Sequence, residues 1–346
     1  MRVVMIGAYK PDYARHYVIR EGLRRAGVDV DERLLPLERR TPGRARALAR
    51  AFPQRGAADV VLLGAFNQTL APAAWALARA HGLPLVVDYL TGLLDAAEDR
   101  GAVPAGRRAL LRAVDRFAIS RLPTLTDTAA HRAAFAAALN VDVRRMAVLP
   151  VGVRDLDPLP PPDPAAPPLA QYAGTYIPFH GVDVMLRAAR LLPDVAFEFI
   201  GAGQMHTAAV RLAHEIGLSN VRFVTGYFPK AELIALQARS TIALGVFGNA
   251  PKTRQVVPNK VYEALALGRA LVTAQSPALA EFFTPGKHLV TVPPGSPDAL
   301  AAALRALLDD PARRAALSAA GRARIEAAFL PQHIGAQLKT TLENLV

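Results

Sequence analysis

The sequence predicts an α/β protein built from two doubly wound domains that face a cleft. Two observations support this prediction. Throughout the 346 residues, short apolar runs alternate with longer Ala-, Leu- and Arg-rich segments of helical period, which is typical of βα units and a parallel sheet. Near the middle, a Pro-rich segment at residues 158–168 can form neither a helix nor a central strand. We therefore expect a first domain over 1–157 and a second over 169–330.

The composition limits both the class of protein and the kind of site. Hydrophobic residues make up 52% of the chain, which indicates a well-cored globular protein. The chain has no cysteine, and its eight histidines form no His-x-x-x-His pair, so we expect no disulfide, no thiol nucleophile and no metal site. No apolar run approaches the roughly 20 residues that span a bilayer, and the first strand reaches Gly7 too soon for a signal peptide. We expect a cytoplasmic protein.

The charge is strongly positive, at +12, but it is not arranged for nucleic acid. Most basic residues are arginines scattered singly, and only 6% of residues are aromatic, so neither a basic stripe nor a base-stacking surface is expected. The first 160 residues carry 24 basic and 16 acidic residues. This surplus would suit an anionic acceptor, or peripheral contact with an anionic membrane at its inner face.

Six strands are expected in the first domain, at residues 2–7, 28–34, 59–63, 84–88, 122–126 and 146–150. Loops at the carboxyl ends of parallel strands line the ligand crevice. The loop after the first strand therefore offers Lys10, Asp12 and Arg15 as candidate acceptor contacts, and the alternative for each of them is an ordinary solvated loop. Asp88, at the end of the fourth strand, either orients a substrate hydroxyl or caps the next segment. The last helix, 331–346, follows a Pro break and is expected to complete this domain.

Six more strands are expected in the second domain, at residues 169–173, 195–200, 221–225, 241–245, 270–273 and 288–292. Gly174, Gly201 and Gly203 stand at the ends of these strands. The run from Ile200 to His206 is an incomplete dinucleotide fingerprint, because His206 occupies the place of the third glycine. A tight turn with close backbone approach to a ligand is the better interpretation.

The segment from Gly248 to Gly268 carries the strongest functional pattern. It is expected to be a polar loop that leads into a helix, with Pro258 at the first helical position. Lys252, Arg254 and Lys260 gather where the unpaired N–H groups of the helix already make the potential positive. A bound anion such as a phosphate would compensate for this repulsion.

Glu263 lies three residues after Lys260, so both side chains project from the same side of the helix. Two interpretations remain open. The pair is either an intrahelical ion pair, or Glu263 binds the ribose diol of a nucleotide with its two acceptor oxygens.

Several stretches together resemble the donor domain of retaining GT-B glycosyltransferases of the group 1, or GT4-type, family, in which two Rossmann-like domains face a cleft. The resemblance covers nearly the whole chain. The matching stretches are residues 172–175, 180–183, 199–203, 220–227, 258–268 and 292–297.

The resemblance implies a role for several residues. Glu263 matches the second acid of the Glu-x7-Glu motif and would bind ribose, while Gln255 stands where the first acid contacts the donor sugar. Thr175 and His180 stand where the family usually has Arg and Lys on the diphosphate, so Lys252, Arg254 and Lys260 would replace that clamp. The other nucleotide contacts that it implies are Gly174, Gly201, Gly203, Tyr227, Pro258 and Asn259.

The resemblance also implies an activity: transfer of a sugar from a nucleotide-sugar to an acceptor hydroxyl with retention, without a metal ion or other cofactor. The acceptor would be a glycan or a lipid-linked sugar, as in bacterial cell-envelope polysaccharide biosynthesis. Such a site must stabilise the negative charge that develops on the leaving phosphate. Two alternatives remain: a non-catalytic binding or regulatory subunit that keeps the fold, and another GT-B reaction such as inverting transfer or epimerisation.

Overall fold

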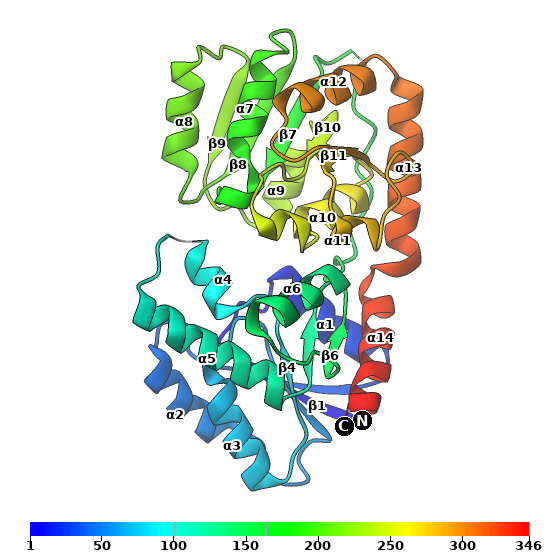
Figure 1. Ribbon diagram of the computed structural model, residues 1–346. Helices are drawn as coiled ribbons and strands as arrows, with labels where there is room; N and C mark the ends of the chain where they lie inside the picture. The colour runs from blue at the N-terminus through cyan, green and yellow to red at the C-terminus, as the bar shows by residue number, and fades with distance from the viewer. Residues whose placement is uncertain (100, 164, 346) are drawn as a thin grey trace. The chain divides into compact units, whose positions relative to one another are not determined.

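The computed structural model describes residues 1–99, 101–163 and 165–345, and the chain divides into two compact units (Figure 1). Unit 1 consists of Met1–Arg154 and Ala328–Val346, and unit 2 of Asp155–Ala327. The described residues between 149 and 168 form no helix or strand. Two residues of the expected segments, Pro164 in the linker and Val346 in the last helix, lie outside the described residues.

Unit 1 is built on a six-stranded parallel sheet with the order β2-β1-β3-β4-β5-β6. Its strands are β1 (Arg2–Gly7), β2 (Asp29–Leu34), β3 (Val60–Leu63), β4 (Leu85–Asp88), β5 (Thr124–Thr126) and β6 (Met146–Val148). The chain places β2 on one side of β1 and then returns to place β3 on the other. The topological switch point of this sheet therefore lies between β1 and β3.

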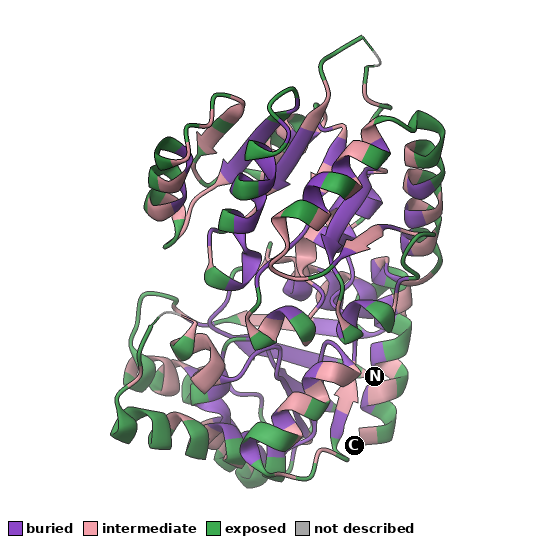
Figure 2. Cartoon of the chain, turned by 45° about the horizontal axis from the view of Figure 1, so that its top comes forward, coloured by how far each residue is buried: buried purple, intermediate pink, exposed green. Residues whose placement is uncertain are grey.

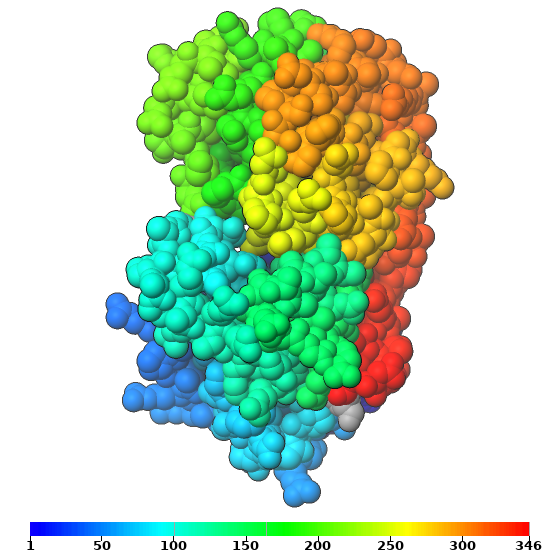
Figure 3. Space-filling view, viewed as in Figure 1, coloured from blue at the N-terminus to red at the C-terminus, as the bar shows by residue number. Residues whose placement is uncertain are grey.

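Helices cover both faces of this sheet. They are α1 (Ala14–Arg25), α2 (Thr41–Ala51), η1 (Gln68–Leu70), α3 (Ala71–His81), α4 (Leu93–Glu98), α5 (Ala105–Arg121), α6 (Ala129–Leu139) and α14 (Pro331–Leu345). The last helix, α14, lies against α1 although the two are far apart in the sequence (Figure 1). The segment that contains α4 and α5, cyan in the space-filling view, forms part of the outer surface of unit 1 (Figure 3).

Unit 2 has a second six-stranded parallel sheet, with the order β12-β11-β10-β7-β8-β9. Its strands are β7 (Leu169–Ala173), β8 (Ala196–Gly201), β9 (Val221–Thr225), β10 (Ile242–Leu244), β11 (Ala270–Ala274) and β12 (Val290–Val292). Here the strand order reverses between β7 and β10. A ligand of this sheet is expected beyond the carboxyl ends of those two strands.

The helices of unit 2 are η2 (Pro178–His180), α7 (Val182–Arg190), α8 (His206–Glu215), α9 (Lys230–Gln237), η3 (Pro251–Arg254), α10 (Asn259–Ala266), α11 (Pro277–Ala280), α12 (Pro297–Leu308) and α13 (Pro311–Ala328). Strands such as β3 and β11 are buried along their whole length, whereas the helices alternate buried and exposed faces (Figure 2). This is the pattern of a parallel sheet covered on both sides, and the predicted α/β fold class is confirmed.

Each expected strand is present, but many end one or two residues away from the expected limits. β6, expected over 146–150, ends at Val148, because Pro150 has no N–H with which to continue the ladder. Pro258 is the N-cap of α10 and not its first residue: its ψ of 147° is extended, and the helix begins at Asn259. Gly268 follows α10 with a φ of +68°, a left-handed conformation that suits glycine.

In the described part of the chain, no helix is both long and apolar enough to cross a membrane.

Candidate functional site

The switch point of unit 2 brings together residues from two segments of the chain. Gly174 and Thr175 directly follow β7, His180 ends η2, and Lys260 lies in the first turn of α10. The Lys260 Nζ lies so close to the Gly174 backbone that a Cβ at Gly174 would be 2.6 Å from it. The loop after β7 and the start of α10 therefore meet at one point.

Tyr172, the next-to-last residue of β7, organises this point. The Lys260 Nζ lies 3.9 Å from the centre of the Tyr172 ring, a distance at which an ammonium is attracted to the π face. The Tyr172 hydroxyl lies 2.8 Å from the Thr175 carbonyl oxygen and 2.7 Å from the His180 Nδ1. The sequence analysis included Tyr172 in the matching stretch 172–175 but assigned it no role.

The Nδ1 of His180 has three polar neighbours and cannot satisfy all of them. The Thr175 carbonyl oxygen is 2.5 Å away, the Tyr172 hydroxyl 2.7 Å and the Lys260 Nζ 3.2 Å. Since a carbonyl oxygen only accepts, the closest contact requires Nδ1–H to donate to Thr175. An Nδ1 that carries this proton cannot accept from Lys260. The favourable contact of the ammonium is then the Tyr172 ring, and no carboxylate in the described residues forms an ion pair with it.

Burial and charge set the protonation of this cluster, which we call the Lys260 cluster (Tyr172, Gly174, Thr175, His180 and Lys260). Burial lowers the pKa of the Lys260 ammonium well below its usual value, and the more distant Glu263 carboxylate offsets this only in part. Burial, and then the charge of Lys260, lowers the pKa of His180 well below its usual value. His180 is therefore neutral near pH 7. An anion placed beside Lys260 would raise the pKa of Lys260 and favour its charged form.

Glu263 forms an ion pair, but not with Lys260. Its Oε1 accepts from the Nζ of Lys230, at 2.5 Å, and both side chains are largely buried. Lys230 is the first residue of α9, so the pair joins α9 to α10. The intrahelical pair that the sequence left open is not formed, because Lys260 turns toward Tyr172.

The glycines at the end of β8 are needed for backbone packing. A Cβ at Gly201 would overlap the Gly174 carbonyl oxygen, and one at Gly203 would lie 2.6 Å from the Tyr176 nitrogen. Both have positive φ, at 130° and 154°. They let the loops after β7 and β8 approach one another, which gives them a structural role next to the site.

The remaining residues predicted in unit 2 lie around the start of α10. Lys252 and Arg254 belong to η3, which the Thr253 hydroxyl anchors by donating to the Phe179 carbonyl oxygen at 3.3 Å. Arg254 is exposed, and Lys252 and Gln255 are half-buried. Asn259 begins α10, and Tyr227, after β9, is 81% exposed.

In unit 1, two predicted acceptor contacts bind each other. Arg15 and Asp88 are both fully buried, and their Nη2 and Oδ1 atoms are 2.7 Å apart. The Arg15 Nη1 also donates to the carbonyl oxygens of Leu149 and Pro150, at 2.6 and 3.1 Å. Asp88 neither faces solvent nor caps a helix. The prediction of an acceptor role for this pair is corrected to a structural one, while Lys10 and Asp12 are exposed.

A second buried pair follows β5. The Asp127 Oδ1 lies 2.7 Å from the His131 Nδ1, and both side chains are almost fully buried. The Thr128 hydroxyl accepts from the His131 backbone N–H and caps α6. The sequence analysis did not identify this pair, although an Asp that ends a strand and a His four residues later on a helix form a recognisable spacing.

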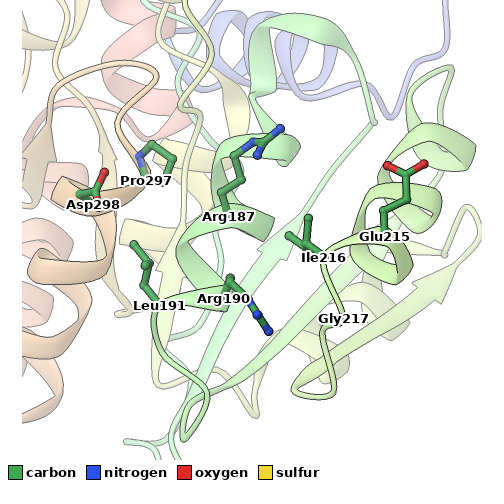
Figure 4. A pocket seen from close by; sticks show the side chains of 8 residues that line it. All are labelled: Arg187, Arg190, Leu191, Glu215, Ile216, Gly217, Pro297 and Asp298. Carbon is green, nitrogen blue, oxygen red and sulfur yellow. The ribbon is translucent and has the colours of Figure 1, made fainter.

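A cavity of about 670 Å³ in unit 2 shares no lining residue with the Lys260 cluster. Figure 4 shows the side chains that line it. Arg187 and Arg190 line it from α7, Glu215 from the end of α8 and Asp298 from the start of α12. It contains none of the predicted site residues, and its exposed charges of both signs offer no preference for an anion. Among the described residues, no group of three His, Asp or Glu side chains is placed to hold a metal ion.

Part of the chain is similar in sequence to known proteins. Residues 183–340 match the glycosyl transferase-like family. The chain is 30% identical over 178 residues to a GDP-mannose-dependent monoacylated α-(1-6)-phosphatidylinositol monomannoside mannosyltransferase of Corynebacterium glutamicum, with 49% of this chain and 45% of the relative covered. It is 31% identical over 156 residues to a related mannosyltransferase of Mycolicibacterium smegmatis, with 42% and 40% covered. The matches span less than half the length of these relatives.

Solved structures resemble the whole chain in fold. HepE of Anabaena, in complex with UDP and glucose, has a TM-score of 0.75 at 15% identity, covering 99% of this chain and all of that one. Sucrose-phosphate synthase of Thermosynechococcus elongatus has a TM-score of 0.76 at 17% identity, covering 99% and 98%. The whole chain therefore shares the two-domain fold of these structures, and residues 183–340 are similar to the glycosyl transferase-like family.

Proposed function

We propose that the protein transfers a sugar from a nucleotide-sugar to an acceptor hydroxyl, with retention of anomeric configuration and without a metal ion. The observation that carries the proposal is the Lys260 ammonium, which lies at the switch point of unit 2 without a carboxylate partner among the described residues. A cation that a protein buries at such a place favours an anionic ligand. The diphosphate of a nucleotide-sugar is the anion that fits a glycosyltransferase.

The proposed role of Lys260 follows from the charge changes of the reaction. As the bond between the sugar and the diphosphate breaks, negative charge grows on the leaving phosphate oxygen. A cation held in a partly dehydrated site stabilises this charge more strongly than water does. Binding of the phosphate also raises the lowered pKa of Lys260, so the ammonium is most strongly charged when the leaving group needs it. Lys252 and Arg254 are proposed to add to this positive potential.

Glu263 is proposed to bind the ribose, and Gln255 the donor sugar. Lys230 holds one oxygen of Glu263 in the described structure, which leaves the other carboxylate oxygen able to accept from a ribose hydroxyl. Two hydrogen bonds to the diol would require Lys230 to share or release its oxygen. Tyr227, exposed after β9, is proposed to contact the nucleotide.

The donor and acceptor are proposed from the relatives. The names of two relatives state GDP-mannose as the donor, and HepE is in complex with UDP and glucose. The same relatives act on phosphatidylinositol monomannosides, which are lipid-linked sugars. We propose an acceptor of this class, a glycan or a lipid-linked sugar, reached from the cytoplasmic side of a membrane.

Nucleotide binding tests the proposal without knowledge of the acceptor. Thermal unfolding is measured with GDP-mannose, UDP-glucose and ADP-glucose, each with EDTA, for the wild-type protein and for Lys260→Met. A ligand at about 100 times its Kd adds about 2.7 kcal/mol of stability, so one nucleotide-sugar should raise the Tm of the wild type by several degrees. Lys260→Met should lose most of that increase. If none of the three shifts the Tm, the donor site is not in unit 2 as proposed.

A non-catalytic subunit is the second candidate. His180 stands where the family usually has Lys, and its Nδ1 already contacts the Thr175 carbonyl oxygen and the Tyr172 hydroxyl. Such a subunit would bind a nucleotide-sugar without cleaving it. Release of free nucleotide from the bound donor, measured with the pure protein, separates the two candidates. An inverting transferase or an epimerase is separated from the proposed reaction by the anomeric configuration of the product.

A further inference from the structure

We propose that Phe66, with Tyr13 at its edge, is the surface on which unit 1 stacks a pyranose ring of the acceptor. The proposal rests on the proposed function, because it assigns the acceptor side of the same reaction. It replaces the predicted contacts Arg15 and Asp88, which bind each other in the interior.

The position of Phe66 is the first argument. Phe66 follows β3, and Tyr13 follows β1 and directly precedes α1. These are the two strands between which the strand order of unit 1 reverses. In doubly wound sheets, ligands bind beyond the carboxyl ends of the strands at this switch point. Unit 1 therefore places two aromatic side chains where such a fold binds its ligand.

The backbone of Phe66 is the second argument. Its φ is +68°, a conformation that is rare for a large side chain and costs on the order of 1–3 kcal/mol. The neighbouring Asn67 enforces it: its side-chain nitrogen donates to the Gly64 and Ala65 carbonyl oxygens, each at 3.0 Å, and its oxygen accepts from the Ala8 N–H at 2.8 Å. Asn67 is only 2% exposed. Strain of this kind persists only where the surroundings hold it, and it is concentrated at ligand sites.

The strained backbone does not bury the side chain, since Phe66 is 43% exposed. Its ring contacts Tyr13 edge to face, with centroids 5.3 Å apart, and lies 6.1 Å from the His16 ring. Burial lowers the pKa of His16, so this neighbour is uncharged near pH 7. The exposed part of the Phe66 ring is thus part of an aromatic surface, and the Tyr13 and His16 rings support Phe66 from the side.

The chemistry of this surface selects a sugar ring. One face of a pyranose is lined with C–H groups and packs on an aromatic ring, while its hydroxyls need polar partners at the rim. Lys10 and Asp12 are exposed on the same loop as Tyr13 and provide such partners. Pockets that combine aromatic walls with a few polar groups are typical of small-ligand sites.

Saturation-transfer NMR with the full chain tests the assignment. The probes are the methyl α-glycosides of mannose, glucose and galactose, and octyl β-glucopyranoside, which carries a sugar ring and an alkyl chain in one molecule. We expect transfer from aromatic protons to the ring C–H protons of at least one probe. In Phe66→Gly, which keeps the positive φ and removes the ring, the Kd of that probe should rise about three- to tenfold. Phe66→Trp should restore binding.

Three controls make the result decisive. Leu110→Ala removes an apolar side chain that is 64% exposed on α5 and should not change probe binding. The Tm of Phe66→Gly should equal or exceed that of the wild type, because glycine relieves the strain. The shift in Tm caused by a nucleotide-sugar should be unchanged in Phe66→Gly, so failure of this proposal is distinguishable from failure of the donor site.

Three outcomes would overturn the proposal. The first is the absence of transfer to the ring protons of any probe, and the second is equal probe affinity in the wild type and Phe66→Gly. The third is transfer to the octyl chain alone, which would assign the surface to a lipid tail.

Discussion

Lys260 has an environment that only an anion would complete. The protein turns its ammonium onto the face of Tyr172, beside a His180 that burial keeps neutral. A cation–π contact recovers only part of the hydration free energy that a partly buried ammonium loses. Lys260 can therefore bind an anion. The cost of burying its ammonium can be measured as a change in the stability of the folded protein.

The first prediction concerns stability and pH. Because the pKa of Lys260 is lowered from 10.5 in the folded protein, the unfolded chain binds more protons between the lowered pKa and 10.5, so folding becomes less favourable as the pH falls through that window. Lys260→Met removes this term. The Tm of Lys260→Met minus the Tm of the wild type should be largest at pH values below the window. This Tm difference should decrease as the pH rises toward 10.5. Thermal unfolding over a pH series measures it, and a difference that does not change with pH would contradict the assignment.

The second prediction concerns the ion pair between Lys230 and Glu263. Glu263→Ala removes hydrogen bonds to the ribose. The binding free energy of the nucleotide-sugar should therefore weaken by about 1–3 kcal/mol, and its Kd should rise accordingly. Lys230→Met leaves the carboxylate in place and should leave the Kd unchanged or lower it. Titration calorimetry compares the two variants. Equal losses in both would mean that the pair only joins α9 to α10.

The rate of donor cleavage distinguishes Lys260 from Glu263. Lys260→Ala should lower the rate constant for release of nucleotide about 10²–10³-fold, because the charge it supplies matters most as the phosphate leaves. Glu263→Ala should act mainly on binding. Single-turnover cleavage at saturating donor checks both variants, and wild-type rates for Lys260→Ala would remove it from the site.

At the scale of elements, the packing of α14 on α1 determines how unit 1 is completed. The two helices cross where Gly22 meets Pro331 and Gly335. A Cβ at either glycine would overlap the backbone of the other helix, and backbone cannot move aside as a flexible side chain can. The absence of side chains at this crossing lets a helix from the end of the chain cover the first helix.

The third prediction tests this crossing. Gly335→Ala should destabilise the protein by about 1–3 kcal/mol, in spite of the higher helix propensity of Ala, because the helices must separate. Gly106→Ala, on α5 with no atoms within 4 Å of the added carbon, is the matched control and should be neutral or slightly stabilising. Urea unfolding gives both values. A neutral Gly335→Ala would mean that α14 is not held by this contact.

The βα alternation predicted all twelve strands, because each apolar run is bounded by glycine or proline and separated by helical period. The family resemblance implied that Gly174, Thr175, His180 and Lys260 serve one site, and the structure brings these four residues close together. Partner choice was not predictable in the same way. That Glu263 pairs with Lys230, 33 residues away in the sequence, depends on how α9 and α10 pack, which no local pattern records. The positive φ of the exposed residue Phe66 could not be predicted from the amino-acid sequence either.

At the scale of the whole molecule, each unit carries its own switch point and its own kind of ligand surface. Unit 2 offers the Lys260 ammonium, which forms no ion pair with a carboxylate of the described residues, and hydrogen-bonding loops, which together suit a nucleotide diphosphate. Unit 1 offers an uncharged aromatic surface, which suits a sugar ring. This division matches the two substrates of the proposed reaction. The surplus of positive charge in the first 160 residues favours an acceptor that is anionic or is presented at an anionic membrane.

The fourth prediction concerns that charge. If the acceptor is presented at an anionic membrane, the protein should float with liposomes that contain phosphatidylglycerol or phosphatidylinositol at low salt and dissociate as salt screens the charges. Liposomes of phosphatidylcholine alone are the control. Equal flotation with both would indicate an apolar contact, and no flotation with either would remove the electrostatic reason for a membrane-bound acceptor.

The last prediction concerns the metal ion. Retaining transfer requires that the charge of the leaving diphosphate be neutralised, and Lys260 with Lys252 and Arg254 is proposed to do this in place of Mg²⁺ or Mn²⁺. Donor cleavage should therefore proceed at an unchanged rate after treatment with EDTA. The informative comparison is with Lys260→Ala, in which added Mg²⁺ or Mn²⁺ should recover part of the lost rate if the ammonium and the metal ion can play the same electrostatic role. Loss of wild-type turnover on chelation, with recovery on adding the metal, would show that the cations around α10 do not suffice.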